Sequence, residues 1–471
     1  MAAAEQLRHW FRFFRSGALR SGYTALGIGS LLIVGCLGLK LTSSRAFSDG
    51  TSVAALARLS QALIMIQSFK GDPSRTPPRL WSDRLGVQPA NDLWRRYGRA
   101  VWWQAWSQDG EAYLVLSAAA WPSNLNAVHQ HQVGAVVLLA SDALHQQQLE
   151  RLLDDVSPGQ SLVQPNTLLA SCLTSLDRGP SVYWRSDAVA SLSGTLAPLL
   201  QQGREGCVRL QLTSDLLRWH GVIGERPLSA VRQRVSITEG FTQTVASSVS
   251  ESPRSLLRAE GRRLDLILGT LLSRQIIQTP LETHYGLDAP MRTLLADRPF
   301  ALRLQERESG DYRAGLQVQL RLKGDRQAWD SVLEAVTERM HSTGFERLSS
   351  TALMATGQDP SVWGRRDDDD RGLVGGWQWL REGESNVLSI GFGIEPANDA
   401  FLSLGDVDAD ADLTVEVLPQ TLKQLNLLGG RWPKPVERAS VLRFRLHRLQ
   451  HQQTPKPWWR MNGELRLSPQ P

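Results

Sequence analysis

The chain lacks the short motifs that mark the common hydrolase active sites. It contains no Gly-x-Ser-x-Gly elbow, no Ser-x-x-Lys followed by Lys-Thr-Gly, and no His-Glu-x-x-His. It also lacks the glycine-rich turn between a strand and a helix that is typical of doubly wound nucleotide-binding folds. These absences predict a protein with no catalytic residues and no cofactor.

The chain beyond residue 50 carries almost no net charge. Residues 1–50 hold six Lys or Arg and two Asp or Glu, so the rest carries 46 basic and 45 acidic side chains. Only six residues of the chain are lysines, and we attribute this scarcity to codon usage rather than to function. Because nucleic-acid binders concentrate basic residues on their surface, this balance argues against a nucleic-acid partner.

Cysteine is scarce, with three in the chain and only Cys172 and Cys207 beyond residue 50. A disulfide between these two would close a loop of about 35 residues, and such a bond is stable in the oxidising compartments outside the cytoplasm. The alternative is two buried thiols, one on a helix and one on a strand. Because the sequence does not give the distance between the two Cα atoms, both states stay open, and we expect free thiols.

One acidic stretch resembles a calcium loop without completing it. Asp406, Asp408 and Asp410 take positions one, three and five. Position six has Ala411 where the sharp turn needs glycine, and position twelve has Val417 where the ion needs a bidentate glutamate. We therefore predict a solvated acidic loop and no metal site, with the three aspartates as weak candidate ligands.

Three histidines lie close together in the sequence, His129, His131 and His145. Their imidazole nitrogens could bind a transition metal. Residues 122–132, however, read as a helix, in which side chains two positions apart point to different sides. The sequence therefore favours a polar helix face over a metal site.

Residues 22–41, GYTALGIGSLLIVGCLGLKL, form a long apolar run. A helix of about 18 residues reaches roughly 27 Å, close to the hydrocarbon thickness of a bilayer. Four arginines precede the run, and the positive-inside rule then keeps residues 1–21 in the cytoplasm. We predict a single-pass membrane anchor with the body in the periplasm or the thylakoid lumen.

Two other fates of this run stay open. Residues 44–46 offer the small residues of a signal-peptidase site, so cleavage could follow Ala46. Residues 33–36 resemble a lipoprotein box, which would leave Cys36 as a lipidated N-terminus, although apolar residues follow it. In all three cases the body lies outside the cytoplasm, at a plasma or thylakoid membrane.

The remaining residues read as paired strands with single helices between them. Residues 107–110 read as a turn between two strands, residues 207–213 and 216–224 as strands, and residues 141–156 and 325–344 as helices. Residues 51–69 read as an amphipathic helix, and the closing parts of two later segments share the order strand, helix, strand, strand. We predict an α+β fold, in which an N-terminal transmembrane helix precedes a duplicated module of antiparallel sheets with packed helices, with repeats at roughly 90–225 and 298–468. The predicted parts are a basic tail (1–21), the anchor (22–41), a juxtamembrane helix and linker (42–89), a first half (90–252), a helical bridge (253–297) and a second half (298–471).

Tryptophan is abundant, with 16 residues. Neighbours in a strand point to opposite sides, so we expect Trp102-Trp103 and Trp458-Trp459 each to place one ring in the core and one outside. Exposed rings serve membrane interfaces, glycans or protein partners. The alternative is that both rings of a pair seal the core.

The C-terminal residues 431–471 contain nine Lys or Arg and two Asp or Glu. Within them, VLRFRLHRL alternates apolar and basic residues, which predicts a half-buried strand with a basic outer face. Arg443, Arg445 and Arg448 are therefore a candidate interaction surface for anionic lipid or an acidic protein partner. The alternative is that they pair with the chain's own acidic segment 395–412.

At DLWRRYGRAVWW, YWRSDAVASLSGTLAPLLQQ and LRWHGVIG, together with the N-terminal anchor, the chain resembles an uncharacterised cyanobacterial family of membrane-anchored proteins of unknown function. The likeness spans much of the body through diffuse patterns, implies a plasma- or thylakoid-membrane setting and transfers no catalytic residue. We expect a non-enzymatic, membrane-anchored extracytoplasmic protein that binds a partner or supports assembly in the envelope or thylakoid. The alternative is an envelope hydrolase whose active site comes together from distant loops.

Overall fold

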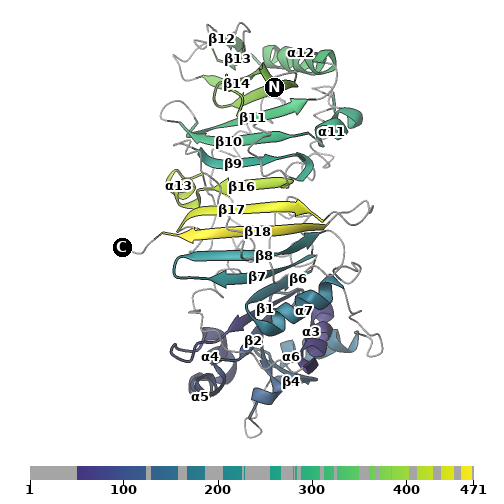
Figure 1. The fold of residues 1–471 in the computed structure, drawn as a ribbon, viewed down its shortest axis with the longest axis vertical. Helices are drawn as coiled ribbons and strands as arrows, with labels where there is room; N and C mark the ends of the chain where they lie inside the picture. The colour runs from purple at the N-terminus through teal and green to yellow at the C-terminus, as the bar shows by residue number, and fades with distance from the viewer. Residues whose placement is uncertain are drawn as a thin grey trace. The chain divides into compact units, whose positions relative to one another are not determined.

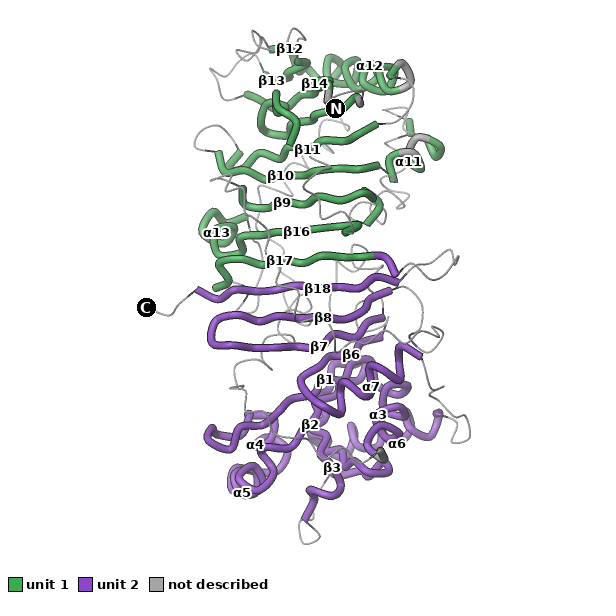
Figure 2. The backbone as a smooth tube through the Cα atoms, in the orientation of Figure 1, with its two compact units in different colours: residues 1–20, 247–430, 437–447 green, residues 21–246, 431–436, 448–471 purple. Residues whose placement is uncertain are grey.

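The structure is a computed structural model that divides into two compact units, shown in separate colours in Figure 2. Unit 1 holds residues 1–20, 247–430 and 437–447, and unit 2 holds residues 21–246, 431–436 and 448–471. The structure describes residues 50–122, 129–156, 167–185, 205–224, 228, 255–266, 279, 282–283, 288–296, 298–307, 312–322, 326–348, 360–365, 372–382, 385–401, 411–427, 436, 438–449 and 458–468.

Unit 2 is an antiparallel sheet with helices against it (Figure 1). Pairing gives the strand order β4–β5–β3–β2–β1–β6–β7–β8–β18. The strands are β1 (Met65–Lys70), β2 (Val101–Trp106), β3 (Ala112–Ser117), β4 (Gln130–Val133), β5 (Val136–Leu139), β6 (Ser181–Trp184), β7 (Glu205–Leu212), β8 (Leu216–Gly224) and β18 (Trp458–Leu467). The helices are α3 (Gly50–Ala62), α4 (Arg79–Leu85), α5 (Val87–Tyr97), α6 (Ala143–Asp154), α7 (Leu168–Arg178) and the 3-10 turn η2 (Ala118–Ala120).

The strands of unit 1 are also antiparallel. Pairing gives the order β12–β13–β14–β15–β11–β10–β9–β16–β17. The strands are β9 (Ser255–Gly261), β10 (Phe300–Glu306), β11 (Ala314–Leu322), β12 (Glu346–Leu348), β13 (Ser361–Gly364), β14 (Leu373–Glu382), β15 (Ser385–Phe392), β16 (Leu413–Val417) and β17 (Ala439–Arg448). The helices are α11 (Ala289–Ala296), α12 (Arg326–Ser342) and α13 (Pro419–Gln424).

The predicted α+β class is wrong, because the described chain is mostly antiparallel sheet, with 18 strands and few helices. Part of the error lies in apolar segments that the sequence assigns to helices. Residues 65–69 of the predicted helix 51–69 belong to β1, and residues 255–261 of the predicted helical bridge form β9. Each of these strands is paired on both sides, so neighbouring strands satisfy its backbone groups.

The two units share one scheme of strand pairing. In unit 2, β1 lies between β2 and β6, β2 pairs with β3, β3 with β5, and β6 with β7. In unit 1, β9 lies between β10 and β16, β10 pairs with β11, β11 with β15, and β16 with β17. The first strands of the shared scheme are β1 and β9. Both lie before the residues at which the predicted repeats begin, 90 and 298.

The sheet of unit 2 is buried on two faces by different helices. One core cluster joins the sheet to α3, α6 and α7, and a second joins it to α4 and α5. Trp102 and Trp103 lie in different clusters with 5% and 2% of their surface exposed, and Trp458 and Trp459 are buried as well. The expectation of one outward ring in each pair is therefore wrong, because both faces of the sheet are covered.

The predicted membrane anchor 22–41, the tail 1–21 and the alternative processing sites at Cys36 and Ala46 lie outside the described residues. Among the described residues, no helix is long and apolar enough to cross a bilayer. The longest of them, α12, has 17 residues and carries charges along its length. We therefore withdraw the predicted transmembrane, single-pass topology and the predicted plasma- or thylakoid-membrane location.

Candidate functional site

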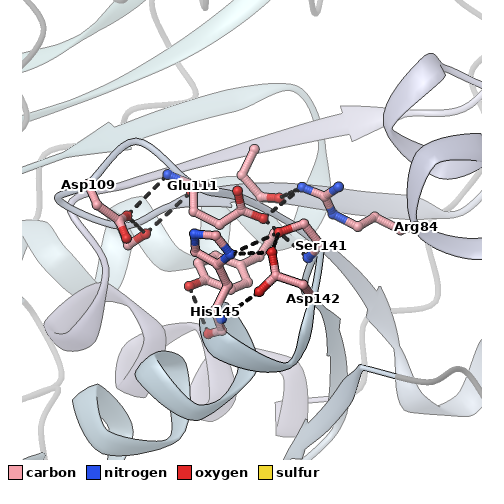
Figure 3. A network of polar contacts seen from close by, with 9 residues as sticks. Arg84, Asp109, Glu111, Ser141, Asp142 and His145 are labelled. Atoms are coloured by element: carbon pink, nitrogen blue, oxygen red, sulfur yellow. Dashed lines mark hydrogen bonds and ion pairs between the residues drawn. The ribbon is translucent and has the colours of Figure 1, made fainter.

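Three turns of unit 2 meet around polar side chains, as Figure 3 shows. They are the C-terminal end of α4, the β2–β3 hairpin and the turn that leads into α6. Their side chains form what we call the turn network: Arg84, Asp109, Glu111, Ser141, Asp142 and His145. Because it gathers acids, a base and a hydroxyl, this network is the candidate active site of the described chain.

The hairpin turn follows from its own residues. Asp109 Oδ1 accepts hydrogen bonds from the Ser107 hydroxyl and from the backbone N–H of Glu111, the latter at 3.1 Å. Gly110 has a φ of 91°, in the left-handed region that favours glycine. Burial raises the pKa of Asp109, but the hydrogen bonds from Ser107 and Glu111 outweigh it and lower that pKa. The predicted turn at residues 107–110 is confirmed.

Asp142 caps the N-terminus of α6. Its Oδ1 accepts the backbone N–H of His145 at 3.0 Å, and its Oδ2 lies 2.8 Å from His145 Nδ1. These two hydrogen bonds lower the pKa of Asp142 to about 2. The same side-chain hydrogen bond raises the pKa of His145, and the carboxylates of Glu111 and Asp109 add to the rise. The cap therefore favours an ionised aspartate beside a protonated imidazole.

Glu111 links the three turns to each other. Its Oε1 accepts from Arg84 Nη2 at 2.8 Å and from the backbone N–H of Ser141 at 3.2 Å. Arg84 Nη2 also donates to the backbone carbonyl of Ala112 at 2.7 Å. The side chains of Arg84 and Glu111 are only 11% and 15% exposed, so the pair is well shielded from water. This contact fixes α4 and the α6 turn to the hairpin.

Ser141, His145 and Asp142 contain the three groups of a hydrolytic triad but not its geometry. In a triad, the carboxylate binds one imidazole nitrogen and the serine binds the other, so that a proton can pass between them. Here Ser141 Oγ lies 3.0 Å and Asp142 Oδ2 lies 2.8 Å from the same atom, His145 Nδ1. The hydroxyl and the carboxylate compete for one nitrogen, so the arrangement suits a helix cap and does not suit acyl transfer.

The predicted metal candidates do not come together. Residues 130–133 form the strand β4, where the sequence predicts a helix. His131 Nδ1 pairs with Glu150 at 3.3 Å, while His145 belongs to the turn network. Among the described residues, no group of three or more potential ligands could hold a metal ion. Asp406, Asp408 and Asp410 lie outside the described residues.

The three arginines of the predicted basic surface on β17 differ in their exposure. Arg443 Nε pairs with Glu416 on β16 at 2.8 Å, and the Arg443 side chain is only 16% exposed. Arg445 is also half-buried, and Arg448 at the strand end is exposed. An interaction surface should be exposed to solvent. Arg443 is not, because its side chain pairs with Glu416, its direct cross-strand partner. We therefore withdraw Arg443 from that surface.

Cys172 on α7 and Cys207 on β7 form a disulfide. Their Cα atoms are 5.9 Å apart, and both residues are fully buried in the core between α7 and the sheet. The expectation of free thiols is therefore wrong. A helix and a strand 35 residues apart share no local signal of their distance, so sequence spacing could not decide the pairing.

Sequence reasoning missed two exposed apolar residues beside the turn network. Val87 follows Arg84 by three residues and is 68% exposed, and Leu144 precedes His145 and is 69% exposed. Among the described residues, one other large hydrophobic residue, Phe392 of unit 1, is strongly exposed, at 47%. The sequence does place both apolar residues at the start of a helix. Val87 directly follows Gly86, and Leu144 lies two residues after Asp142.

Comparison with known proteins supplies no relative from which to transfer a function. No protein-family model, curated protein or solved structure matches the chain. The resemblance to an uncharacterised cyanobacterial family therefore stays a prediction. Function has to be argued from the geometry of the two units.

Proposed function

We propose that the protein is a non-enzymatic binding protein that takes a protein partner on the three turns of unit 2. We call these turns the turn surface: residues 83–88, 107–111 and 141–145. The observation that carries the proposal is the exposure of Val87 and Leu144 at 68% and 69% beside the turn network. Contiguous exposed apolar side chains on a monomer mark interaction sites, and Val87 and Leu144 belong to turns that the turn network joins.

The turn network supports this role by making the turn surface rigid. Arg84, Glu111 and Asp142 hold the three turns through buried or capped hydrogen bonds, so little conformational freedom remains to be lost on binding. Glu111 joins the other two turns, because its Oε1 accepts hydrogen bonds from both Arg84 and the backbone N–H of Ser141. A partner would meet a preformed surface.

Charge on the turn surface indicates the chemistry of the partner. Arg84 and Glu111 pair with each other and are shielded from water, so the carboxylates of Asp83, Asp109 and Asp142 outnumber His145 among the remaining charged groups. A complementary segment carries an apolar side chain to cover Leu144 and Val87 and a basic side chain for the carboxylates. The buried disulfide further supports a protein that matures in an oxidising compartment.

The test uses the full chain and a Val87→Ser, Leu144→Ser double variant as baits in extracts of the cells that produce the protein. A Phe392→Ser variant is the matched control, because it removes an exposed apolar residue from unit 1. We expect a protein that the wild type and the control retain and the double variant loses. Equal retention by all three baits contradicts the proposal.

The hydrolase alternative has its own test. Ser141→Ala removes the hydroxyl beside His145 and leaves the Asp142 cap in place. If the protein hydrolyses a generic ester or peptide and this variant does not, the non-enzymatic proposal is wrong. We expect the wild type and the variant to be equally inactive.

A further inference from the structure

A row of charged side chains crosses one face of the unit 1 sheet. Arg303 on β10 is the direct cross-strand partner of Arg258 on β9. On the other side of β9, Arg258 is opposite Glu416, and Glu416 is opposite Arg443 on β17. Direct partners in antiparallel strands have their Cβ atoms about 5 Å apart on the same face. We call these four residues the arginine row.

The two ends of the row are compensated differently. Glu416 accepts from Arg443 Nε at 2.8 Å, so this end is a pair of opposite charges. Arg258 Nε donates to Glu260 on its own strand. Arg303 faces the like charge of Arg258 directly across the two strands, while the carboxylates of Glu260 and Asp399 attract it.

Arg303 is held in place by an aromatic ring, while its Nε donor has no partner among the described residues. Its guanidinium carbon lies 4.0 Å from the centre of the Phe401 ring, a cation–π contact that occupies the face of the planar group. The N–H donors lie in the plane of the guanidinium and point away from that contact. Among the described residues, the buried Arg303 Nε has no hydrogen-bond partner. Burial lowers the pKa of Arg303 and the charge of Arg258 lowers it further, while the carboxylates of Glu260 and Asp399 partly offset this fall.

We propose that Arg303 and Arg258 form a binding site for an oxyanion, the phosphate or carboxylate group of a small ligand. The planar fork of a guanidinium matches two oxygens of such a group, and two guanidinium groups side by side can clamp it. The anion would offset the repulsion between the two arginines and accept hydrogen bonds from their guanidinium groups. The site lies in unit 1 and is independent of the turn surface.

The experiment titrates the full-length protein with inorganic phosphate, and separately with acetate, against sodium chloride of equal ionic strength. Binding is followed by the rise in melting temperature and by calorimetry. We expect a saturable effect beyond that of chloride. Saturation by phosphate identifies a phosphoryl ligand, and saturation by acetate with no preference for phosphate identifies a carboxylate. Effects that match chloride for both anions overturn the proposal.

Variants locate the site. Arg303→Gln and Arg258→Gln should each weaken binding by about tenfold or more, as expected for loss of a charge-assisted hydrogen bond. Arg303→Lys keeps the charge but loses the planar fork, so it should weaken binding too. The matched control is Arg448→Gln, which removes the same charge from an exposed position outside the row. Equal weakening by the control would mean general screening and overturn the site.

Discussion

Trp102 and Trp103 are neighbours in β2, and their rings are buried on opposite faces of the same sheet. Trp102 stacks on Phe69 with ring centres 4.3 Å apart and meets Trp81 edge-on at 5.7 Å. Trp103 donates its indole N–H to the backbone carbonyl of Leu176 on α7 at 2.9 Å. Two successive residues thus anchor two layers of helices.

The first prediction concerns Trp103. Trp103→Ala should lower the free energy of unfolding by about 3–5 kcal/mol, because it leaves a large cavity and an unpaired carbonyl under α7. Trp106 in the same strand is only partly buried, so Trp106→Ala should cost less. Denaturant titration of both variants measures the difference. Equal losses would mean that burial on the α7 side does not set the stability of the strand.

The second prediction concerns the disulfide. Alkylation of denatured, non-reduced protein should leave Cys172 and Cys207 unlabelled, and reduction should expose both to the reagent. Replacing both with alanine should cost about 4 kcal/mol, from the entropy of closing a loop of this length in the unfolded chain. Peptide mass spectrometry separates these sites from Cys36. Labelling of either cysteine without reduction would contradict the bond.

The third prediction concerns the pH dependence of the α6 cap. The folded pKa of His145 is raised, so its contribution is complete below the unfolded value of about 6.5 and is lost as pH rises through the folded pKa. The folded pKa of Asp142 is about 2, so its contribution is present above its unfolded value and is lost as pH falls towards 2. The cap should therefore stabilise unit 2 most between about pH 4 and 6.5.

Asp142→Asn separates the charge from the cap. Asparagine still accepts the backbone N–H of His145, and it no longer pairs with a protonated imidazole. The stability difference between wild type and this variant, measured by denaturation from pH 3 to 9, should shrink above the folded pKa of His145. A difference that is flat across that range would show that the ion pair contributes nothing.

The fourth prediction concerns Glu205, a buried carboxyl that accepts from Tyr183 Oη at 3.0 Å. Burial raises its pKa, although hydrogen bonds from Leu228 and Tyr183 oppose the rise. A raised folded pKa means that the contribution of this acid is complete below its unfolded pKa and is lost as pH rises through the folded value. Glu205→Gln keeps the acceptor without the charge. It should therefore gain stability relative to wild type as pH rises from 4 to 8, and a constant difference would contradict this.

Local patterns in the sequence were sufficient for many strands. Residues 207–213 and 216–224 were predicted as strands, and the structure has β7 at Glu205–Leu212 and β8 at Leu216–Gly224, because a short apolar run bounded by turn residues is a local signal. The hairpin turn at 107–110 and the helix α12 were predicted from other local signals, the turn residues Asp109 and Gly110 and the helical spacing of apolar residues. Little of the candidate site could be predicted in this way. Its three turns are separated by 20 to 60 residues, and only folding brings Arg84, Glu111 and Ser141 together.

By itself, the sequence determined the β-hairpins, the capped helix α6 and the near-neutral charge of the body, since each depends on residues close along the chain. Only the tertiary structure decided that residues 65–70 and 255–261 are central strands, because a short apolar run fits a helix or a doubly paired strand equally well. It also decided the Cys172–Cys207 bond and the pairing of Arg443 with Glu416. These depend on strand register and on the packing of a helix against a sheet, which bring together residues far apart in the chain.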